Sequence, residues 1–402
     1  MCMTEPIMIT GAGIVSAIGN NKAQTIDALR NMQTGIQPMR YLQSSHREFP
    51  VGEVKLSNEQ MKQMLGISEE PTTRTTLMGM LAMEETLSDA GLKGQEGLNV
   101  ALVSGTTVGG MDKSEQYYLD YLDNDSRKAY IKTHDCGATT EMIAHRFGIF
   151  SMATSISTAC SSAANAVIFG ANLIRSGMTE IAVVGGSECI TKFHLNGFNS
   201  LMILDQEQCR PFDATRKGLN LGEGASYIVL ETIASAQRRG IEPIGELSGF
   251  GNACDAFHQT ASSDDGQGAF LAMKKALDMA GLKPADIDYV NAHGTGTPNN
   301  DFSESQALKR LFGQQMPKVS STKGMTGHTT SASGSVEATI SLLALQNGFI
   351  PGNYGWNLQM EDGITPVADC QLGVELKHVM CNSFGFGGND SCLIISQPSK
   401  AM

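Results

Sequence analysis

The order of strand-like and helix-like segments constrains the fold of this chain most, because one series of segments is followed by a second of the same kind. Strand-like runs of the first series lie at residues 6–10, 99–104, 154–157, 180–185 and 225–231, with helical stretches such as 24–31 and 75–89 between them. The second series starts near Pro243 and contains helices at 266–279, 303–311 and 334–347 and strands at 287–292, 318–321 and 390–396. This alternation predicts an α/β fold, and its repetition predicts two similar halves.

Each half contains the same landmark, a strand end that leads into a helical run of small residues. Cys160 lies there in the first half and His328 in the second, as expected if one strand–helix unit was duplicated. The composition of 402 residues with 44 glycines and few aromatic residues fits a large core with closely packed strand–helix junctions.

Cys160 stands at the predicted start of a helix. The positive end of the helix dipole and the free amides there favour a thiolate, so the local sequence favours Cys160 as a nucleophile. A free cysteine is more often a buried structural residue, so this interpretation needs catalytic partners.

Two glycine-rich loops offer such partners. Residues 290–298 carry His293 after an apolar strand end, and residues 320–328 carry both Lys323 and His328 after another. A single loop histidine is usually just solvated and a single lysine is usually a surface charge. However, α/β folds collect their ligand sites at the carboxyl ends of strands, so these junctions can converge on one pocket.

Together with the motifs at 8–16, 209–213, 222–225 and 382–388, these residues resemble the β-ketoacyl-[acyl-carrier-protein] synthases, the elongating condensing enzymes of the thiolase superfamily. The resemblance covers nearly the whole chain. It implies a thiolase-like, five-layered αβαβα fold in which residues 161–171 and 330–338 form two buried central helices. It also implies a boundary near residue 245, with the nucleophile in residues 1–245 and the histidines, the lysine and a glycine-rich gate in residues 246–402.

The resemblance assigns the catalytic roles. Cys160 would carry the acyl group as a thioester, while His293 and His328 would line the site where a malonyl thioester loses carbon dioxide. Lys323 would support His328. Neutral imidazole N–H groups suit this step because they stabilise an enolate oxygen without protonating the carbanion.

Further residues follow from the same resemblance. The backbone N–H groups of Cys160 and Phe386 would form an oxyanion hole, and Phe384 and Phe386 would act as a gate with glycines as hinges. Glu304 and Glu337 would stand behind the catalytic groups, with Glu337 as the buried partner of the Lys323 ammonium.

Composition excludes several other classes. Nine scattered cysteines without metal-type spacing predict reduced thiols, no metal and no cofactor. The net charge of −12 argues against nucleic acid and anionic membranes as partners. The start of the chain lacks a basic segment and a cleavage site, and no apolar stretch could span a bilayer, so we expect a cytoplasmic protein.

The resemblance also implies acyl carrier protein, in acyl and malonyl forms, as the partner, and a dimer. The dimer would be a homodimer or a heterodimer with a chain-length-factor-like subunit. Because carrier proteins are acidic, docking requires a local basic patch. The candidates are Arg127, Lys128, Lys132, Lys192, Arg216 and Lys217, and also Lys62 with Arg74.

Two alternatives stay open at this point. A thiolase-type acyltransferase would use coenzyme A thioesters and would need Cys381 as a second catalytic cysteine, although we interpret Cys381 as structural. A non-catalytic chain-length-factor-like subunit would share the fold but typically lacks the nucleophile.

The sequence departs from the family pattern near the expected acyl entrance. Asn389 and Asp390 follow Gly388 where the family usually has Thr-Asn, and residues 298–301 read Pro-Asn-Asn-Asp instead of Pro-x-Gly-Asp. Residues 202–204 are larger than usual. The product is therefore expected to be either a fatty acid or a specialised polyene or polyketide chain.

Overall fold

The computed structural model describes residues 6–67, 71–95 and 97–398, and its centre is one sheet of ten strands. The strand order is β3-β2-β4-β5-β1-β6-β12-β11-β7-β8. The strands of the N-terminal half are β1 (Ile7–Ser16), β2 (Val100–Gly105), β3 (Phe150–Ile156), β4 (Ile181–Glu188) and β5 (Gly224–Thr232). Those of the C-terminal half are β6 (Gly245–Cys254), β7 (Tyr289–Asn291), β8 (Lys318–Ser320), β11 (His378–Gly385) and β12 (Asn389–Ser396).

The two halves of this sheet repeat one topology. β2 pairs in parallel with β3 and β4, as β7 does with β8 and β11, and the remaining pairs within each half are antiparallel. The halves join where β1 runs antiparallel to β6, with Ile7 opposite Leu247. This confirms the expected α/β fold of two similar halves. We propose that they divide between residues 245 and 246, at the start of β6.

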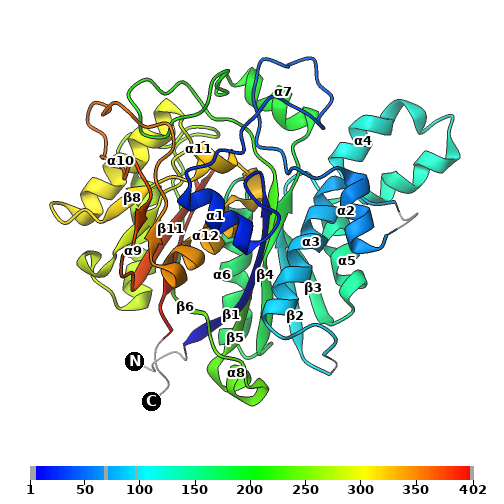
Figure 1. Cartoon of the computed structure of the whole chain (residues 1–402), viewed down its shortest axis with the longest axis horizontal. Helices are drawn as coiled ribbons and strands as arrows, with labels where there is room; N and C mark the ends of the chain where they lie inside the picture. The colour runs from blue at the N-terminus through cyan, green and yellow to red at the C-terminus, as the bar shows by residue number, and fades with distance from the viewer. Residues whose placement is uncertain (1–5, 68–70, 96, 399–402) are drawn as a thin grey trace.

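Helices cover both halves and also separate them (Figure 1). α6 (Ser162–Arg175) and α12 (Ser333–Asn347) pack against each other in the middle of the molecule. The outer layer of the N-terminal half contains α2 (Asn58–Leu65), α3 (Arg74–Asp89) and α5 (Cys136–Phe147), and that of the C-terminal half contains α9 (Gln267–Ala280) and α10 (Pro298–Phe312). The remaining helices are α1 (Lys22–Arg30), α4 (Met111–Tyr117), α7 (Lys192–Ser200), α8 (Ile233–Arg239) and α11 (Lys323–Thr326).

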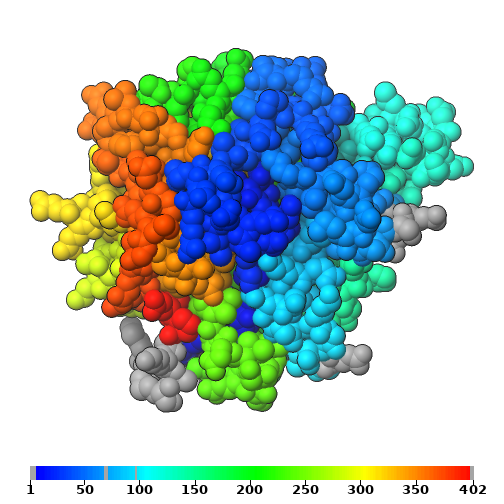
Figure 2. All heavy atoms as spheres, in the orientation of Figure 1, coloured from blue at the N-terminus to red at the C-terminus, as the bar shows by residue number. Residues whose placement is uncertain are grey.

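Shorter elements complete the chain. They are the 3-10 turns η1 (Tyr118–Asp120), η2 (Asp125–Thr133), η3 (Pro284–Asp286) and η4 (Thr330–Ala332), and the two-stranded sheet of β9 (Phe349–Ile350) and β10 (Gln371–Leu372). The segment from α4 to η2 projects from the body of the molecule, and α1 lies at the surface between the two halves (Figure 2).

The central helices are built from small residues because their backbones approach closely. A Cβ atom on Gly334 of α12 would lie 2.5 Å from the backbone nitrogen of Ala164 in α6, and one on Gly105 of β2 would lie 2.6 Å from that of Ala163. Alanine, valine and leucine side chains of both helices then join the largest apolar cluster, which lies between the halves. This close packing fixes the start of α6, where Cys160 lies.

The structure differs from the sequence-based expectations at several elements. β1 extends beyond Thr10 to Ser16, because Gly11 and Gly13 remain in the strand and leave room for α3. α10 begins at Pro298, five residues before the predicted start at Ser303, since proline is favoured in the first turn of a helix. Within the described residues, no helix is long and apolar enough to cross a membrane.

Candidate active site

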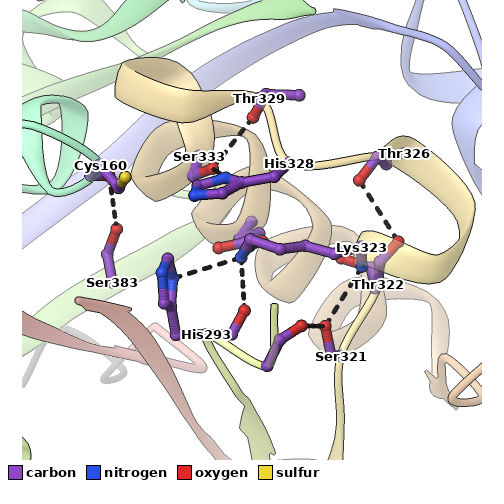
Figure 3. Close-up of polar contacts among 12 residues, drawn as sticks. Cys160, His293, Ser321, Thr322, Lys323, Thr326, His328, Thr329, Ser333 and Ser383 are labelled. Carbon is purple, nitrogen blue, oxygen red and sulfur yellow. Dashed lines mark hydrogen bonds and ion pairs between the residues drawn. The ribbon is translucent and has the colours of Figure 1, made fainter. Parts of the chain in front are cut away.

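A strained turn presents Cys160 at the start of α6. Ala159 has a φ of 52°, a left-handed conformation that residues other than glycine rarely adopt. Cys160 follows it, is 6% exposed, and its carbonyl accepts a hydrogen bond of 3.0 Å from Ser383 Oγ (Figure 3). The turn therefore places the thiol beside strand β11 of the other half.

The thiol of Cys160 is protonated at neutral pH. Burial raises its pKa to about 11, although the Lys323 ammonium and the backbone N–H groups of Phe386 and Cys160 act in the opposite direction. Burial thus outweighs the helix-end effect expected from the sequence. The two contributing amides, those of Cys160 and Phe386, are the pair expected from the family resemblance to form an oxyanion hole.

His293 and His328 lie edge to face, with ring centroids 5.3 Å apart. Burial lowers the pKa of both imidazoles well below the usual value, and the Lys323 charge lowers both further. Both rings are therefore neutral at physiological pH.

Hydrogen bonds select the same tautomer in both rings. Lys323 Nζ, which can only donate, lies 3.3 Å from His293 Nδ1, and the backbone N–H of Thr330 donates to His328 Nδ1 at 3.3 Å. Each Nδ1 therefore accepts, and each proton resides on Nε2. His293 and His328 line one cavity with Cys160, so this cavity contains two neutral N–H donors.

Lys323 contacts a different histidine from the one expected. Its Nζ donates to the carbonyl of His293 at 2.6 Å and forms an ion pair with Glu337, whereas His328 Nδ1 instead contacts Ser333 Oγ at 3.0 Å. Lys323 was expected to support His328; its contacts in the structure are with His293 and Glu337, because α11 places the ammonium behind His293 (Figure 3), and only its charge acts on His328. Burial raises the pKa of Glu337 to about 7 while Lys323 lowers it.

Glu304 fixes the loop that carries His293. Its carboxylate accepts hydrogen bonds from the backbone N–H groups of His293 at 2.9 Å and Gly294 at 2.8 Å, and from Asn382 Nδ2 at 3.1 Å. Glu304 thereby ties the first histidine loop to α10 and to strand β11.

The glycine-rich segment after β11 covers the thiol. Phe384 packs 5.8 Å from the His293 ring, and Phe386 stacks on Phe198 of α7 with centroids 5.8 Å apart. Both phenylalanines line a cavity of about 230 Å³. Its other walls are formed by residues near the expected entrance, among them Ile203, Leu219, Thr260, Thr295, Thr297, Asn299 and Asn300.

Two other sequence-based candidates lie elsewhere. Cys381 is buried within β11 and does not line the cavity, and burial raises its pKa strongly. Arg74, a candidate for carrier docking, is 7% exposed and forms a salt bridge with Glu223, so it was wrong to count it as a surface charge. No cluster of three potential metal ligands occurs in the part of the chain that the structure describes.

Some supporting residues could not be recognised from local sequence. Ser333 and the Thr330 amide orient His328 from within a small-residue run, and only their spacing from the histidine could have indicated this role. Asn382 directly precedes the gate motif and belongs to the family pattern, but its bond to Glu304 depends on the fold. Nothing in the sequence around Phe198 indicated that its ring would stack on Phe386.

A duplicated α/β fold in which a thiol and two imidazoles share a cavity at the central helices defines the thiolase-like condensing enzymes. Comparison with known proteins narrows this class. The model of the β-ketoacyl synthase N-terminal domain matches residues 4–236, and that of the C-terminal domain matches residues 244–357. The chain belongs to the β-ketoacyl synthase family, and it is an enzyme of that kind.

Individual relatives agree with this assignment. The 3-oxoacyl-[acyl-carrier-protein] synthase 2 of Vibrio harveyi is 31% identical over 417 residues, which cover 97% of this chain and 98% of that protein. The protein of the same name from Staphylococcus aureus strain COL is 30% identical over 420 residues, 99% of either chain. The family match confirms the resemblance and leaves the thiolase alternative without support.

Solved structures confirm the fold. The ishigamide ketosynthase/chain length factor matches with a TM-score of 0.91 at 28% identity, over 98% of this chain and 100% of that chain. A ketosynthase in complex with its chain length factor from Xenorhabdus doucetiae matches with a TM-score of 0.85 at 29% identity, over 99% of both chains.

Proposed function

We propose that this enzyme joins an acyl group held on Cys160 to malonyl-[acyl-carrier protein] and releases β-ketoacyl-[acyl-carrier protein] and carbon dioxide. The observation that carries this proposal is the pair of neutral Nε2–H imidazoles in the cavity that contains the thiol. Such a pair can donate two hydrogen bonds to an enolate oxygen. The reaction would extend a fatty acid or a polyketide-type chain by two carbons.

The first step loads the enzyme. The Cys160 sulfur attacks the carbonyl carbon of an acyl thioester, the bond to the carrier sulfur breaks, and the proton lost by Cys160 ends on the carrier sulfur, which departs as the free thiol. The negative charge that develops on the carbonyl oxygen meets the backbone N–H groups of Cys160 and Phe386. Because burial raises the pKa of the thiol to about 11, Cys160 enters this step as the thiol and must lose its proton to take up the acyl group.

The second step makes the nucleophile. The bond between the malonyl methylene carbon and the carboxylate breaks, carbon dioxide leaves, and the electron pair forms an enolate whose oxygen accepts from His293 and His328 Nε2–H. The enolate carbon then attacks the Cys160 thioester. This attack forms the new carbon–carbon bond. Collapse of the tetrahedral intermediate then restores the carbonyl and breaks the carbon–sulfur bond, and the expelled Cys160 sulfur regains a proton.

Cys160→Gln separates these steps and tests the proposal. An amide in place of the thiol cannot accept an acyl group, but it leaves both imidazoles in position. We expect the variant to release carbon dioxide from malonyl-carrier protein while forming no β-ketoacyl product, as measured by mass spectrometry of the carrier. Cys381→Ala serves as the control and should retain both activities. Condensation by Cys160→Gln would contradict the proposal.

Carrier docking is supported near the cavity entrance. Arg216 donates to the carbonyl of Pro298, which lines the cavity, and Lys217 beside it is exposed. We propose that Lys217 and the exposed Lys128 and Lys132 contact the acidic carrier. The free state of all eight described cysteines suits the reducing cytoplasm, where we place the enzyme.

A homodimer is supported by the edge of the sheet. Among the residues that the structure describes, β3 is an edge strand with no neighbour on its outer side, and it is only partly buried. The projecting α4–η2 segment exposes Tyr118, Leu119, Leu122 and Ile131. An unprotected strand edge and, on a separate segment, exposed apolar side chains both fit association with a second copy. The alternative partner at this edge of the sheet is a chain-length-factor-like subunit, since the similar ketosynthase from Xenorhabdus doucetiae is in complex with its chain length factor.

A further inference from the structure

Asp390 is a buried carboxyl group at the base of the gate. It is 5% exposed and is the second residue of β12, two residues after Gly388. It lies opposite Phe384 in β11 and Ala253 in β6. Directly opposed residues of antiparallel strands share a face, so Asp390 points with Phe384 toward the outer layer of the C-terminal half.

The groups around Asp390 are acidic. Asp255 lies just after β6 and Glu304 lies on α10, and both charges act on Asp390. A Cβ atom on Gly268 of α9 would lie 2.0 Å from Asp390 Oδ2 and 2.7 Å from Asp255 Cβ, so the two aspartates meet over the first turn of this helix. Lys275 of α9 donates instead to the carbonyl of Asn252.

Hydrogen-bond donors are distributed unevenly between the two aspartates. Asp255 accepts from Ser263 N at 2.7 Å, from Ser263 Oγ at 2.8 Å and from Gly268 N at 3.0 Å. Within the described residues, no donor contacts the Asp390 carboxyl group. The Asp255 carboxyl group thus accepts three hydrogen bonds, whereas the buried Asp390 carboxyl group accepts none from the described residues.

The same aspartates are attached to the gate. The backbone N–H of Asp255 donates to the carbonyl of Gly388 at 2.9 Å, as does that of Asp390 at 3.1 Å, and Gly387 N donates to the carbonyl of Gln259 at 2.8 Å. Repulsion between Asp255 and Asp390 would consequently act directly on the segment 385–389, which carries the Phe386 amide.

We propose that Asp390 retains a proton, donates it in a hydrogen bond to Asp255, and so holds the glycine-rich gate closed over Cys160. Asp390 is then a positioning residue for the condensation, and this inference rests on the proposed function. Loss of the proton to solvent leaves two adjacent carboxylates and loosens the gate. The usual family sequence has asparagine here, which cannot titrate.

The carboxyl group of Asp390 titrates in a pH range in which the protein can be studied. Burial raises the pKa of Asp390 to about 8, and Asp255 and Glu304 raise it as well. The protonated fraction of Asp390 therefore falls roughly tenfold between pH 7 and pH 9. The gate is expected to be closed below pH 8 and loosened above it.

Hydrogen–deuterium exchange of the peptide that covers residues 385–389 tests this without substrate. After correction for intrinsic exchange, we expect the wild-type segment to exchange up to roughly tenfold faster at pH 9 than at pH 7. Asp390→Asn should remove this difference. Asp265→Asn changes an exposed carboxyl group in the loop between β6 and α9, and this control should retain the difference between pH 7 and pH 9.

The acylation rate of Cys160 gives a second measurement. Because the thiol titrates in both proteins, the ratio of wild-type to Asp390→Asn rates isolates the aspartate. It should fall with a midpoint near pH 8, because a loosened segment 385–389 no longer holds the Phe386 amide where the oxyanion of acylation forms. Equal exchange at both pH values in the wild type, or a constant rate ratio, would overturn the proposal. If Asp390→Asn does not fold, the wild-type exchange alone decides. A pH-dependent gate in a protein that forms no acyl adduct would support this inference and refute the proposed function.

Discussion

At the scale of single residues, the site depends on which groups are charged. His293 and His328 are neutral because they are buried near the Lys323 ammonium, and this charge is balanced by Glu337. A buried ammonium without its carboxylate would be very costly, as would the carboxylate without the ammonium. Glu337 therefore acts on the two imidazoles only through the Lys323 ammonium that it balances.

Lys323→Met should destabilise the protein by about 3–5 kcal/mol at pH 8, because it leaves the Glu337 carboxylate buried without a partner. The pKa of Glu337, about 7 with Lys323 present, would rise further without it. The group is then neutral at low pH, so the loss should shrink as the pH falls from 8 to 5. Chemical denaturation at both pH values measures this effect.

The matched control for this change is Lys274→Met, which breaks an exposed ion pair with Asp278 on α9. It should cost less than about 0.5 kcal/mol at either pH. Similar losses for Lys323→Met and Lys274→Met, or a loss that is independent of pH, would show that the buried pair does not behave as described.

At the scale of elements, the contact between α6 and α12 holds the halves of the site in register. α6 begins beside Cys160, and α12 carries Glu337 and Ser333. Only a glycine at position 334 permits the observed approach, because a Cβ atom there would meet the backbone and side chain of Ala164. The small residues at this crossing are a geometric requirement of the contact between α6 and α12.

Gly334→Ala should therefore lower the stability by about 1–3 kcal/mol and slow acylation of Cys160, because the helices must separate. Gly197→Ala in α7 makes the same substitution where no atom lies within 4 Å of the new Cβ. This control should be neutral or stabilised by up to about 1 kcal/mol. Thermal unfolding compares the two, and equal midpoints would contradict the role given to the helix contact.

The sequence predicted the alternation of strands and helices, because periodicity and glycine-rich junctions are local properties, but it indicated no range for β6, α5 or α7. The predicted strand ended at Thr10, since glycines usually interrupt strands. The local sequence does not reveal that Gly11 and Gly13 stay in β1 because α3 packs closely against them. It named Cys160, His293, Lys323 and His328, which share one site. The pairing of Lys323 with His293 depends on how α11 lies across the first histidine loop, and no local pattern contains that information.

At the scale of the whole molecule, duplication explains why the site lies where it does. Both halves have the same strand order, and each contributes a strand–helix junction with a reactive residue. Pairing of β1 with β6 and contact of α6 with α12 bring the two junctions together, so Cys160 and His328 line one cavity although 168 residues separate them. Neither half contains the site alone.

The central claim is that Cys160 carries the growing chain. Intact-protein mass spectrometry after incubation with a series of acyl-carrier-protein thioesters tests it most directly, with Cys160→Ala as the comparison. We predict a single acyl adduct on the wild type, none on Cys160→Ala, and discharge of the adduct as a β-ketoacyl product when malonyl-carrier protein is added. A wild-type protein that forms no adduct with any donor, or an adduct that persists in Cys160→Ala, would contradict the account.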